Sequence, residues 1–496
     1  MVVSLLLAVP AVVGLWLVTG GRALPVATAR TAAAAAAGAT LVLAVVLAVT
    51  RTGVDRSWLP EIGVRWSFGV DGIAVPLVLL TASVGVLVAA HAWVEVPAGG
   101  APATFLGCLV LVEAGALATF TARDAVLFFV AFELVLVPMW VLISRYGDRH
   151  DERARADAGH RFILYTAVGS TLMLVGILAL VTSAGTSDLE ALADGAGAAL
   201  PPERQLLVAA LLVTGLGVKV PVFPLHTWLP PAHTTAPTAG SVLLAAVLLK
   251  MGTYGLVRLP VSTVPDGFAT LSPVLGVVGV VGIVWGALVC LVERDLKRLI
   301  AYSSVAHMGF VVLALAAGSE TGLQAALFAN IAHGVVSALL FVLVGGLKQR
   351  WGSVDLALPR PALRETSPRL GFVLVVGLAA SLGLPGLAGF WGEFLAVYAA
   401  WMPAADRPRG LFVACAVAAA VGAALAAAYA LRVARTVWVG EAVDPGDGAV
   451  PTPDTRGVEL AVLGVLAAVT VALGVVPGPL LGLTADAVAQ LVAGAR

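Results

Sequence analysis

The chain has 496 residues, of which 60% are hydrophobic and 12% are charged, and its formal net charge is zero. A typical soluble domain carries about 25% charged residues, so this composition indicates a polytopic membrane protein and excludes an ordinary soluble enzyme. The lack of a basic excess argues against a nucleic-acid partner, and the three cysteines, which form no CxxC pair, argue against an iron–sulfur or zinc site.

Apolar runs divide the chain into predicted membrane spans, because a helix needs about 20 mainly apolar residues to cross the hydrocarbon core. The first run is treated as a span and not as a signal peptide, since its first basic residue, Arg22, follows it. The tail 479–496 is too short and mixed for a further span. The fold class predicted is an all-α polytopic membrane protein with about 14 transmembrane helices near 2–19, 31–50, 72–95, 104–121, 124–144, 160–183, 205–228, 236–258, 271–292, 297–317, 321–347, 370–401, 409–432 and 457–476.

Basic residues give the predicted topology. The odd-numbered loops hold 18 Lys and Arg residues and the even-numbered loops hold 8, so the odd loops are expected in the cytoplasm and both termini outside. Arginine outnumbers lysine 25 to 4 and alanine is abundant, as in proteins from GC-rich bacteria. We therefore expect a multi-pass protein of the bacterial inner membrane.

Two of the spans are interrupted, span 7 by Pro221 and Pro224 and span 12 by Pro385. Proline lacks an N–H group and clashes with the carbonyl four residues earlier. Paired interrupted helices at matching positions are typical of transporters with inverted repeats, and a separation of five spans gives repeats that run in opposite directions. The division expected is 1–103 for spans 1–3, 104–258 for the first repeat of spans 4–8, 271–432 for the second repeat of spans 9–13, and 433–496 for the last loop, span 14 and the tail.

Lys219 lies in the interrupted span 7. A lysine at mid-membrane depth costs about 2.5–3.5 kcal/mol on insertion scales, so such residues usually face a wet interior and have a function. Pro221 and Pro224 would free the carbonyls of Gly217 and Val220, and the end of the first half-helix would favour a cation. We interpret this site as the centre of an ion path.

Glu133 in span 5 is the expected partner of Lys219. Burial disfavours the charged form of a side chain and a nearby opposite charge favours it. A Glu–Lys pair that separates and re-forms can therefore switch the lysine between holding and releasing a proton. The alternative is a static ion pair that holds helices together.

Other ionisable residues lie within the spans. Lys250, on what reads as an intact helix, and Glu393, early in the second half of span 12, are candidates for a proton relay, and so is His333. Glu113 and His307 are secondary candidates, because a buried histidine can simply satisfy its own hydrogen bonds. Asp71 and Asp124 read as residues at helix ends.

These residues lie in stretches that resemble the antiporter-like subunits of the proton-pumping NADH:quinone oxidoreductase, respiratory complex I. The resemblance covers nearly the whole chain and is carried by Phe132-Glu-Leu-Val-Leu-Val-Pro-Met139, Val218-Lys-Val-Pro-Val-Phe-Pro-Leu-His-Thr-Trp-Leu-Pro230, Ala236-Pro-Thr-Ala-Gly-Ser-Val242, Leu249-Lys-Met-Gly-Thr-Tyr254, Tyr302-Ser-Ser-Val-Ala-His-Met-Gly309 and Gly383-Leu-Pro-Gly-Leu-Ala-Gly-Phe-Trp-Gly-Glu-Phe394. Glu393 favours the M-type subunits, because the sister subunits and Mrp-type antiporter chains resemble one another in carrying Lys there.

The resemblance implies a proton pump driven by quinone reduction in other subunits. Glu133 and Lys219 would then form the input pair, Lys250 and His333 the central relay, and Glu393 the exit. Flavin, iron–sulfur clusters and quinone would belong to partner subunits, and the neighbours in the membrane would be subunits of the L and N types. The chain itself would hold no cofactor and no redox site.

The chain departs from the family pattern after the break in span 7. Pro231 and Thr235 stand where the family usually has an acid and a further polar or acidic residue. How this edge of the broken helix is hydrated is therefore an open question at the level of sequence.

Three other functions compete with the proton pump. A chain of a Mrp-type cation/proton antiporter is the first, although Lys in place of Glu393 would have favoured it. A structural membrane scaffold is the second, and it would tolerate apolar residues at Glu133, Lys219 and Glu393. A haem site ligated by His307 and His333 is a more remote third.

Overall fold

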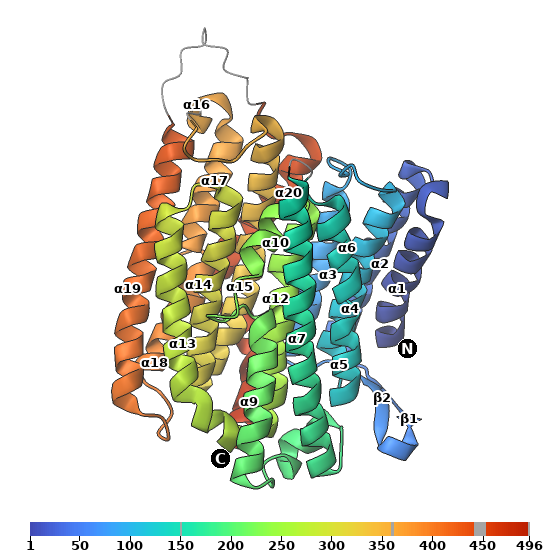
Figure 1. The fold of residues 1–496 in the computed structure, drawn as a ribbon, viewed down its shortest axis with the longest axis vertical. Helices are drawn as coiled ribbons and strands as arrows, with labels where there is room; N and C mark the ends of the chain where they lie inside the picture. Colours follow the sequence, from blue (N-terminus) through green and yellow to red (C-terminus); the bar gives the residue numbers. More distant parts are fainter. Residues whose placement is uncertain (149–150, 359–361, 441–452, 495–496) are drawn as a thin grey trace.

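The structure is a computed structural model that describes residues 1–148, 151–358, 362–440 and 453–494. Long helices run side by side along the vertical axis of Figure 1. The α-helices are α1 Val2–Gly20, α2 Val26–Thr50, α3 Ala74–His91, α4 Pro102–Thr121, α5 Ala125–Glu133, α6 Leu136–Tyr146, α7 Glu152–Ala184, α8 Leu189–Ala191, α9 Pro202–Lys219, α10 Leu229–Thr235, α11 Thr238–Leu243, α12 Leu249–Leu256, α13 Pro265–Val292, α14 Leu296–Ala316, α15 Glu320–Trp351, α16 Leu363–Thr366, α17 Pro368–Ser381, α18 Ala388–Trp401, α19 Arg409–Val433, α20 Gly457–Val475 and α21 Gly478–Gly494.

Shorter elements connect or extend these helices. Two are 3₁₀ turns, η1 Gly21–Ala23 and η2 Pro60–Ile62. Four are π-helical segments, η3 Leu192–Ala196, η4 Leu244–Leu248, η5 Val257–Val261 and η6 Ala434–Val439. The strands β1 Val54–Leu59 and β2 Val64–Phe68 form an antiparallel hairpin, with Val54 opposite Phe68.

The helices confirm the predicted fold class. Among the described residues, 12 helices are long and apolar enough to cross a membrane, and each overlaps one predicted span. The two predicted spans that are missing from this set are the interrupted ones, which form the separate helices α9 and α10 and the separate helices α17 and α18. The total of fourteen crossings, the inverted repeats and the four-part division stay predictions.

The ends of the molecule carry different loops. The β1–β2 hairpin and the C-terminal end lie at the lower end in Figure 1, and α16 lies at the upper end. This separation agrees with the expected alternation, since the hairpin belongs to loop 2 and α16 to loop 11. Which end faces the cytoplasm stays a prediction, and Arg149 and Arg360, which entered the charge count, lie outside the described residues.

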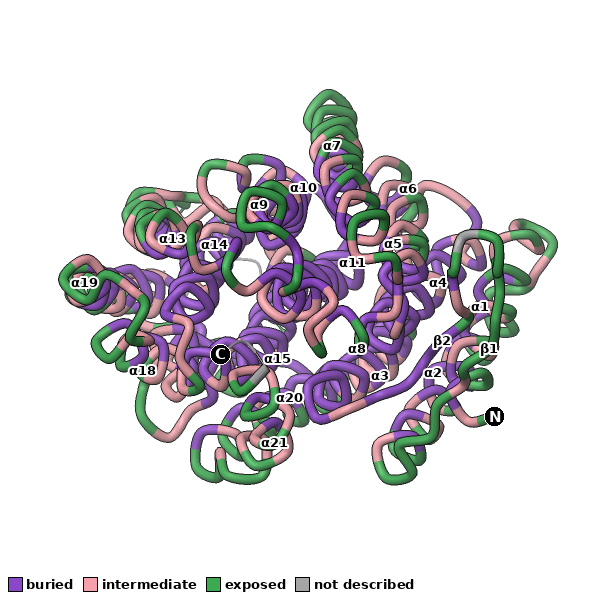
Figure 2. The backbone as a smooth tube through the Cα atoms, turned by 90° about the horizontal axis from the view of Figure 1, so that it is seen from below, coloured by how far each residue is buried: buried purple, intermediate pink, exposed green. Residues whose placement is uncertain are grey.

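The buried core lies along the middle of an elongated cross-section (Figure 2). In the most apolar stretch of α15, 94% of the residues are buried, whereas the share is 33% for Arg409–Val439 at the edge. The segment from α11 to α12 and the helix α14 are buried to a similar extent as α15. The ionisable residues on these central helices are therefore surrounded by protein and not by lipid.

Asp124 ties the hairpin to the helices. Its buried carboxylate accepts hydrogen bonds from the backbone N–H groups of Val126 (2.9 Å) and Leu127 (3.0 Å), which caps α5. It also accepts from the backbone N–H of Arg65 in β2 (3.1 Å) and from the Ser187 hydroxyl (2.5 Å). The prediction that Asp124 lies at a helix end is confirmed.

Asp71 has the same role at α3. Its carboxylate accepts from the N–H groups of Ile73 (3.0 Å) and Ala74 (2.9 Å), and it forms an ion pair with Arg258 at the end of span 8. Burial raises the pKa of Asp71, but the charge of Arg258 and these hydrogen bonds lower it more, to about 2. The carboxylate is therefore held in its charged form.

The structure corrects one detail of the predicted helices, the intact helix expected around Lys250, and adds two details, in span 5 and in the tail. Span 5 is divided after Glu133 into α5 and α6, where Pro138 lacks an N–H and clashes with the carbonyl of Leu134. The helix that carries Lys250 is not regular, since the π segment η4 ends two residues before it. The tail forms the 17-residue helix α21.

The Asp71–Arg258 ion pair makes stability depend on pH. Because the pKa of Asp71 is about 2 in the folded chain against an ordinary value of 3.8, its contribution is fully present above about pH 4 and is lost as the pH falls toward 2. We expect Asp71→Asn to destabilise the protein by about 2 kcal/mol at pH 6, with a smaller deficit at pH 3. Thermal unfolding in detergent, followed by tryptophan fluorescence, measures this. The exposed Glu61→Gln variant is the control, and an equal deficit at both pH values would contradict the assignment.

Candidate functional site

Lys219 is the last residue of α9, so the helix ends where the sequence predicted its interruption. The carbonyls next to it are occupied. The Val222 N–H donates to the Gly217 carbonyl (2.9 Å), and the Trp228 indole N–H donates to the Val218 carbonyl (2.9 Å). The expectation that the Gly217 carbonyl is free beside the lysine is therefore wrong, because the chain after the break folds back onto α9.

The Lys219 amine is surrounded by aromatic rings. The side chain is buried, and its Nζ makes no hydrogen bond with the residues that the structure describes. The amine lies 4.9 Å from the ring centre of Phe132 and 6.0 Å from that of Phe162. Ring faces attract a cation, so the site is compatible with a charged amine that is not locked in one hydrogen-bonding geometry.

Glu133 lies next to this site without touching the lysine. It is the last residue of α5, it is half-buried, and it accepts a short hydrogen bond from the Ser170 hydroxyl of α7. No ion pair joins Glu133 to Lys219, whose Nζ has no hydrogen-bond partner among the described residues, although Phe132, the neighbour of Glu133, lies against the amine. The structure thus places the two members of the predicted pair near each other without direct contact between their charged groups.

Lys250 has a fixed geometry. Its fully buried Nζ donates to the Ala245 carbonyl (2.6 Å), which belongs to the π segment η4, and lies 2.5 Å from Nδ1 of His333 on α15. Such π segments are frequent at functional sites. The sequence predicted Lys250 and His333 as members of one relay, and the structure brings them into direct contact.

His333 leads on to His307 and Glu393. Its Nε2 lies 3.1 Å from the Ser337 hydroxyl, and its ring centre lies 5.5 Å from that of His307 on α14. The Nε2 of His307 lies 3.3 Å from a carboxylate oxygen of Glu393 on α18 and 2.8 Å from the Ser381 carbonyl at the end of α17. Residues from four separate helices, α14, α15, α17 and α18, thus meet at the second interruption.

A small cavity joins the last three of these groups. His333, His307 and Glu393 all line it. Its volume is about 30 Å³, which is about the volume that one molecule occupies in liquid water. Gly383 borders Glu393, since a Cβ atom at position 383 would come 2.5 Å from its carboxylate. We call Lys250, His333, His307 and Glu393 the relay row.

Lys219 and the relay row come from neighbouring helices. A Cβ atom added at Gly252 of α12 would lie 3.1 Å from Cβ of Lys219, so α9 and α12 pack closely between the two lysines. No described hydrogen bond joins Lys219 to Lys250. The buried ionisable side chains therefore form two groups: the relay row, and a separate group around Lys219.

Glu113 does not belong to either part. Its buried carboxylate points from α4 toward Gly85 of α3, where a Cβ atom would come 2.3 Å from Oε1, and Oε1 has no hydrogen-bond partner among the described residues. Ala33 and Ala37 of α2 line the same small space. The structure thus separates this secondary candidate from His307, the other one.

Two further basic residues, Lys297 and His233, are buried outside the relay row. Lys297, at the first residue of the predicted span 297–317, is buried at the start of α14 and donates to the Ala236 carbonyl (2.5 Å). His233 on α10 is fully buried, stacks on Phe341 at 4.4 Å, and neither ring nitrogen has a partner among the described residues. Lys297 lies at a predicted helix end, where a lysine usually reaches water, so no local pattern predicts its burial.

The described residues contain no group of three or more His, Cys, Asp and Glu side chains that could hold a metal ion. Both ring nitrogens of His333 contact other side chains, Lys250 and Ser337. The arrangement of the relay row suits proton transfer between adjacent side chains. The three cysteines are buried and free.

Comparisons with known proteins show the family to which the chain belongs. A family model described as NADH:quinone oxidoreductase/Mrp antiporter, TM matches residues 122–418. The chain is 40% identical over 391 residues to NAD(P)H-quinone oxidoreductase chain 4 1 of Synechococcus sp. (strain JA-3-3Ab), covering 79% of this chain and 72% of that relative. It is 37% identical over 452 residues to NADH-quinone oxidoreductase subunit M of Rhodobacter capsulatus, covering 88% and 84%.

A solved structure shows the same fold. A chain of respiratory complex I from Thermus thermophilus with bound NADH superposes with a TM-score of 0.85 at 31% identity, and the match covers 99% of this chain and 100% of that chain. The family model spans more than half of the chain and includes Lys219, Lys250, His333 and Glu393. The chain therefore belongs to the family of membrane subunits shared by NADH:quinone oxidoreductases and Mrp antiporters, and its relatives there are chain 4 and subunit M of the oxidoreductases.

Proposed function

We propose that the chain is the M-type proton-translocating subunit of a bacterial NADH:quinone oxidoreductase. Protons would pass along the relay row, with Glu133 and Lys219 as the input pair and Glu393 as the exit. The observation that carries this proposal is the sequence of contacts from Lys250 through His333 and His307 to Glu393. A row of ionisable side chains inside an apolar bundle is costly unless the side chains have a function.

The redox chemistry would take place in other subunits. Flavin, iron–sulfur clusters and quinone are expected there, and subunits of the L and N types are the expected neighbours in the membrane arm. This chain would be part of an enzyme complex without a redox site of its own. Its two ends would lie on the outer side of the inner membrane, as the distribution of basic loops predicts.

A Mrp-type antiporter chain is the second candidate, because the matching family model covers both classes. Glu393, which stands where the resemblance predicts Lys in antiporter chains, favours the oxidoreductase. Purification of the native complex distinguishes the two. Co-purifying flavin and iron–sulfur subunits support the oxidoreductase, and a set of small membrane chains alone would support the antiporter.

The input pair gives the first test of the proposal. We expect Lys219→Ala and Glu133→Ala each to lower proton pumping by at least about tenfold, because a missing proton carrier removes a transfer step that is usually worth more than this. Pumping is measured from the pH gradient formed by membrane vesicles on addition of NADH, and assembly from the amount of intact complex.

The matched control for these variants is Arg161→Ala, which removes a charge from the exposed surface of α7. It should pump normally. Full pumping in both input variants would rule out this relay and favour a structural scaffold. Loss of the assembled complex in both would indicate a static ion pair.

His307 gives the second test, because the structure places it between His333 and Glu393. We expect His307→Gln to lower pumping several-fold: a glutamine can still donate to the Ser381 carbonyl, but it cannot take up and release a proton near neutral pH. His160→Gln, at an exposed position on α7, is the control. Normal pumping by the His307 variant would show that protons do not pass through this ring.

A further inference from the structure

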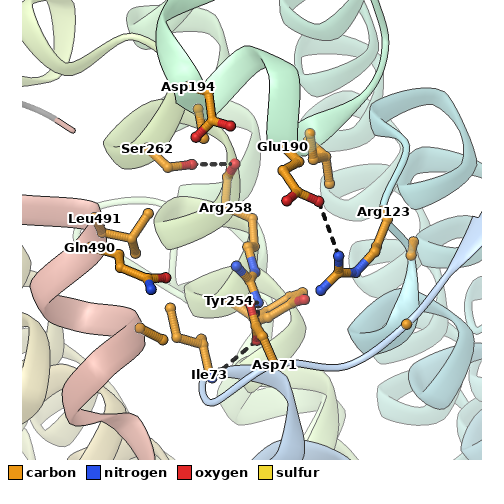
Figure 3. A pocket seen from close by; sticks show the side chains of 15 residues that line it. Asp71, Ile73, Arg123, Glu190, Asp194, Tyr254, Arg258, Ser262, Gln490 and Leu491 are labelled. Atoms are coloured by element: carbon orange, nitrogen blue, oxygen red, sulfur yellow. Dashed lines mark hydrogen bonds and ion pairs between the residues drawn. The ribbon is translucent and has the colours of Figure 1, made fainter. Parts of the chain in front are cut away.

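Polar side chains inside a folded protein usually pair with one another or with the backbone. In the polar cavity that Figure 3 shows, Asp71 pairs with Arg258, and Glu190 pairs with Arg123. A buried polar group without a partner has lost its hydration without replacement, so each such group needs an explanation. One of them lies beside the input pair.

This group is the hydroxyl of Thr166 on α7. The side chain is 3% exposed, and its Oγ1 has no hydrogen-bond partner among the described residues. A threonine in a helix can donate to the carbonyl four residues earlier, and Thr171 and Thr182 of the same helix do so, at 2.8 and 2.7 Å. The Thr166 hydroxyl makes no such bond, so it is available to another partner.

Thr166 lies on the face of α7 that points to the input pair. Phe162, Thr166 and Ser170 follow one another at intervals of four residues, so they share one helix face with successive Cβ atoms about 5–6 Å apart. At one end of this row, Ser170 donates to the Glu133 carboxylate. At the other end, the centre of the Phe162 ring lies 6.0 Å from the Lys219 amine. Thr166 is therefore placed between the carboxylate and the amine.

The packing of α7 on α9 gives the same placement. A Cβ atom added at Gly169 would lie 2.9 Å from the Gly215 carbonyl oxygen, and one added at Gly176 would lie 3.0 Å from the Leu212 side chain. Later residues of α7 thus meet earlier residues of α9, because the two helices are antiparallel. Lys219, one turn after Gly215, is then level with the turn of α7 before Gly169, and this turn carries the unpaired hydroxyl.

A hydroxyl in this position can join the two members of the input pair. It has one donor and two acceptor sites, whereas an ammonium group has donors only and a carboxylate has acceptors only. The Lys219 amine has no hydrogen-bond partner in the described part of the chain either, and it is carried on a flexible four-carbon stem. The Thr166 hydroxyl can thus accept from Lys219 and donate to Glu133 at the same time.

We propose that Thr166 is the bridge through which the input pair exchanges its proton. When the Lys219 amine turns toward α7, its ammonium group donates to the Thr166 oxygen, and the Thr166 hydroxyl donates to the Glu133 carboxylate. The ammonium gives one proton to the hydroxyl oxygen while the hydroxyl gives its own proton to the carboxylate, which leaves a neutral amine and a neutral acid. Ser170 holds Glu133 within reach of the bridge. This inference deepens the proposed function and rests on it.

Removal of the hydroxyl at nearly constant shape tests the bridge. In membrane vesicles that contain the whole complex, we expect Thr166→Val to lower NADH-driven proton pumping several-fold, because valine keeps the branched shape but can neither accept nor donate. Thr166→Ser keeps the hydroxyl and should pump near the wild-type level. The matched control is Thr171→Val, which removes an exposed hydroxyl from the same helix and should pump normally.

Two results would overturn the bridge. One is full pumping by an assembled Thr166→Val complex. The other is an equal loss in Thr166→Val and Thr166→Ser, because the loss would then follow the change in packing and not the hydroxyl. Both leave the proposed function intact as long as Lys219→Ala and Glu133→Ala still lower pumping, whereas full pumping by those two variants would remove the proposed function and the bridge together.

A relocated carboxylate tests the position of Thr166, also where Thr166→Val does not assemble. Aspartate is close to threonine in size, so Thr166→Asp in the Glu133→Ala background should place a carboxylate within reach of the Lys219 amine. We expect this double variant to pump several-fold better than Glu133→Ala alone. Thr166→Asn in the same background has the same shape without a proton-accepting carboxylate and should recover nothing. An assembled Thr166→Asp double variant that pumps no better than Glu133→Ala would overturn the inference.

Discussion

The burial of positive charge is the constraint on which the interior of this protein depends. An ammonium group taken out of water must donate hydrogen bonds that replace those it made to water; the amine of Lys250 donates to the Ala245 carbonyl and lies against Nδ1 of His333. The first partner belongs to the π segment η4, and the second requires α15 to lie directly against span 8. The position of the central helix and the irregular winding of its neighbour are thus both linked to one side chain.

Lys219 meets the same constraint in a different way. It lies at the C-terminal end of α9, where the helix dipole favours a cation, and it faces the rings of Phe132 and Phe162. Neither interaction fixes the amine in one direction, and Glu133 is held by Ser170 instead. The two lysines therefore differ in mobility: a small shift at the end of α9 can change the partner of Lys219, whereas Lys250 is fixed from two sides.

Much of this architecture could be predicted from the sequence, because it depends on local patterns. Apolar runs predicted the spans. Prolines predicted the end of α9 at Lys219 and the interruption before α18, and Asp71 and Asp124 predicted the starts of α3 and α5. Most of the buried ionisable residues were also predicted, since a charged residue in a long apolar run is easily recognised, but the burial of Lys297 at a helix end was not. The sequence pattern could not predict the direction in which a buried side chain points. In α4, nearly every side chain is buried, so no polar face indicates that Glu113 points toward α3.

The contacts between distant segments could not be predicted for a related reason. His307 joins His333 and Glu393 only because α14, α15 and α18 meet at the second interruption, and nothing near His307 in the sequence distinguishes it from a histidine that fills space. Once these helices are packed, the relay row extends from Lys250 to Glu393, with the ring centres of His333 and His307 5.5 Å apart beside a small cavity, while Lys219 and Glu133 form no ion pair. Proton transfer to Lys250 would then depend on a rearrangement at Lys219, whose amine has no hydrogen-bond partner among the described residues. The second half of the path would need only the hop of a proton between groups already in place.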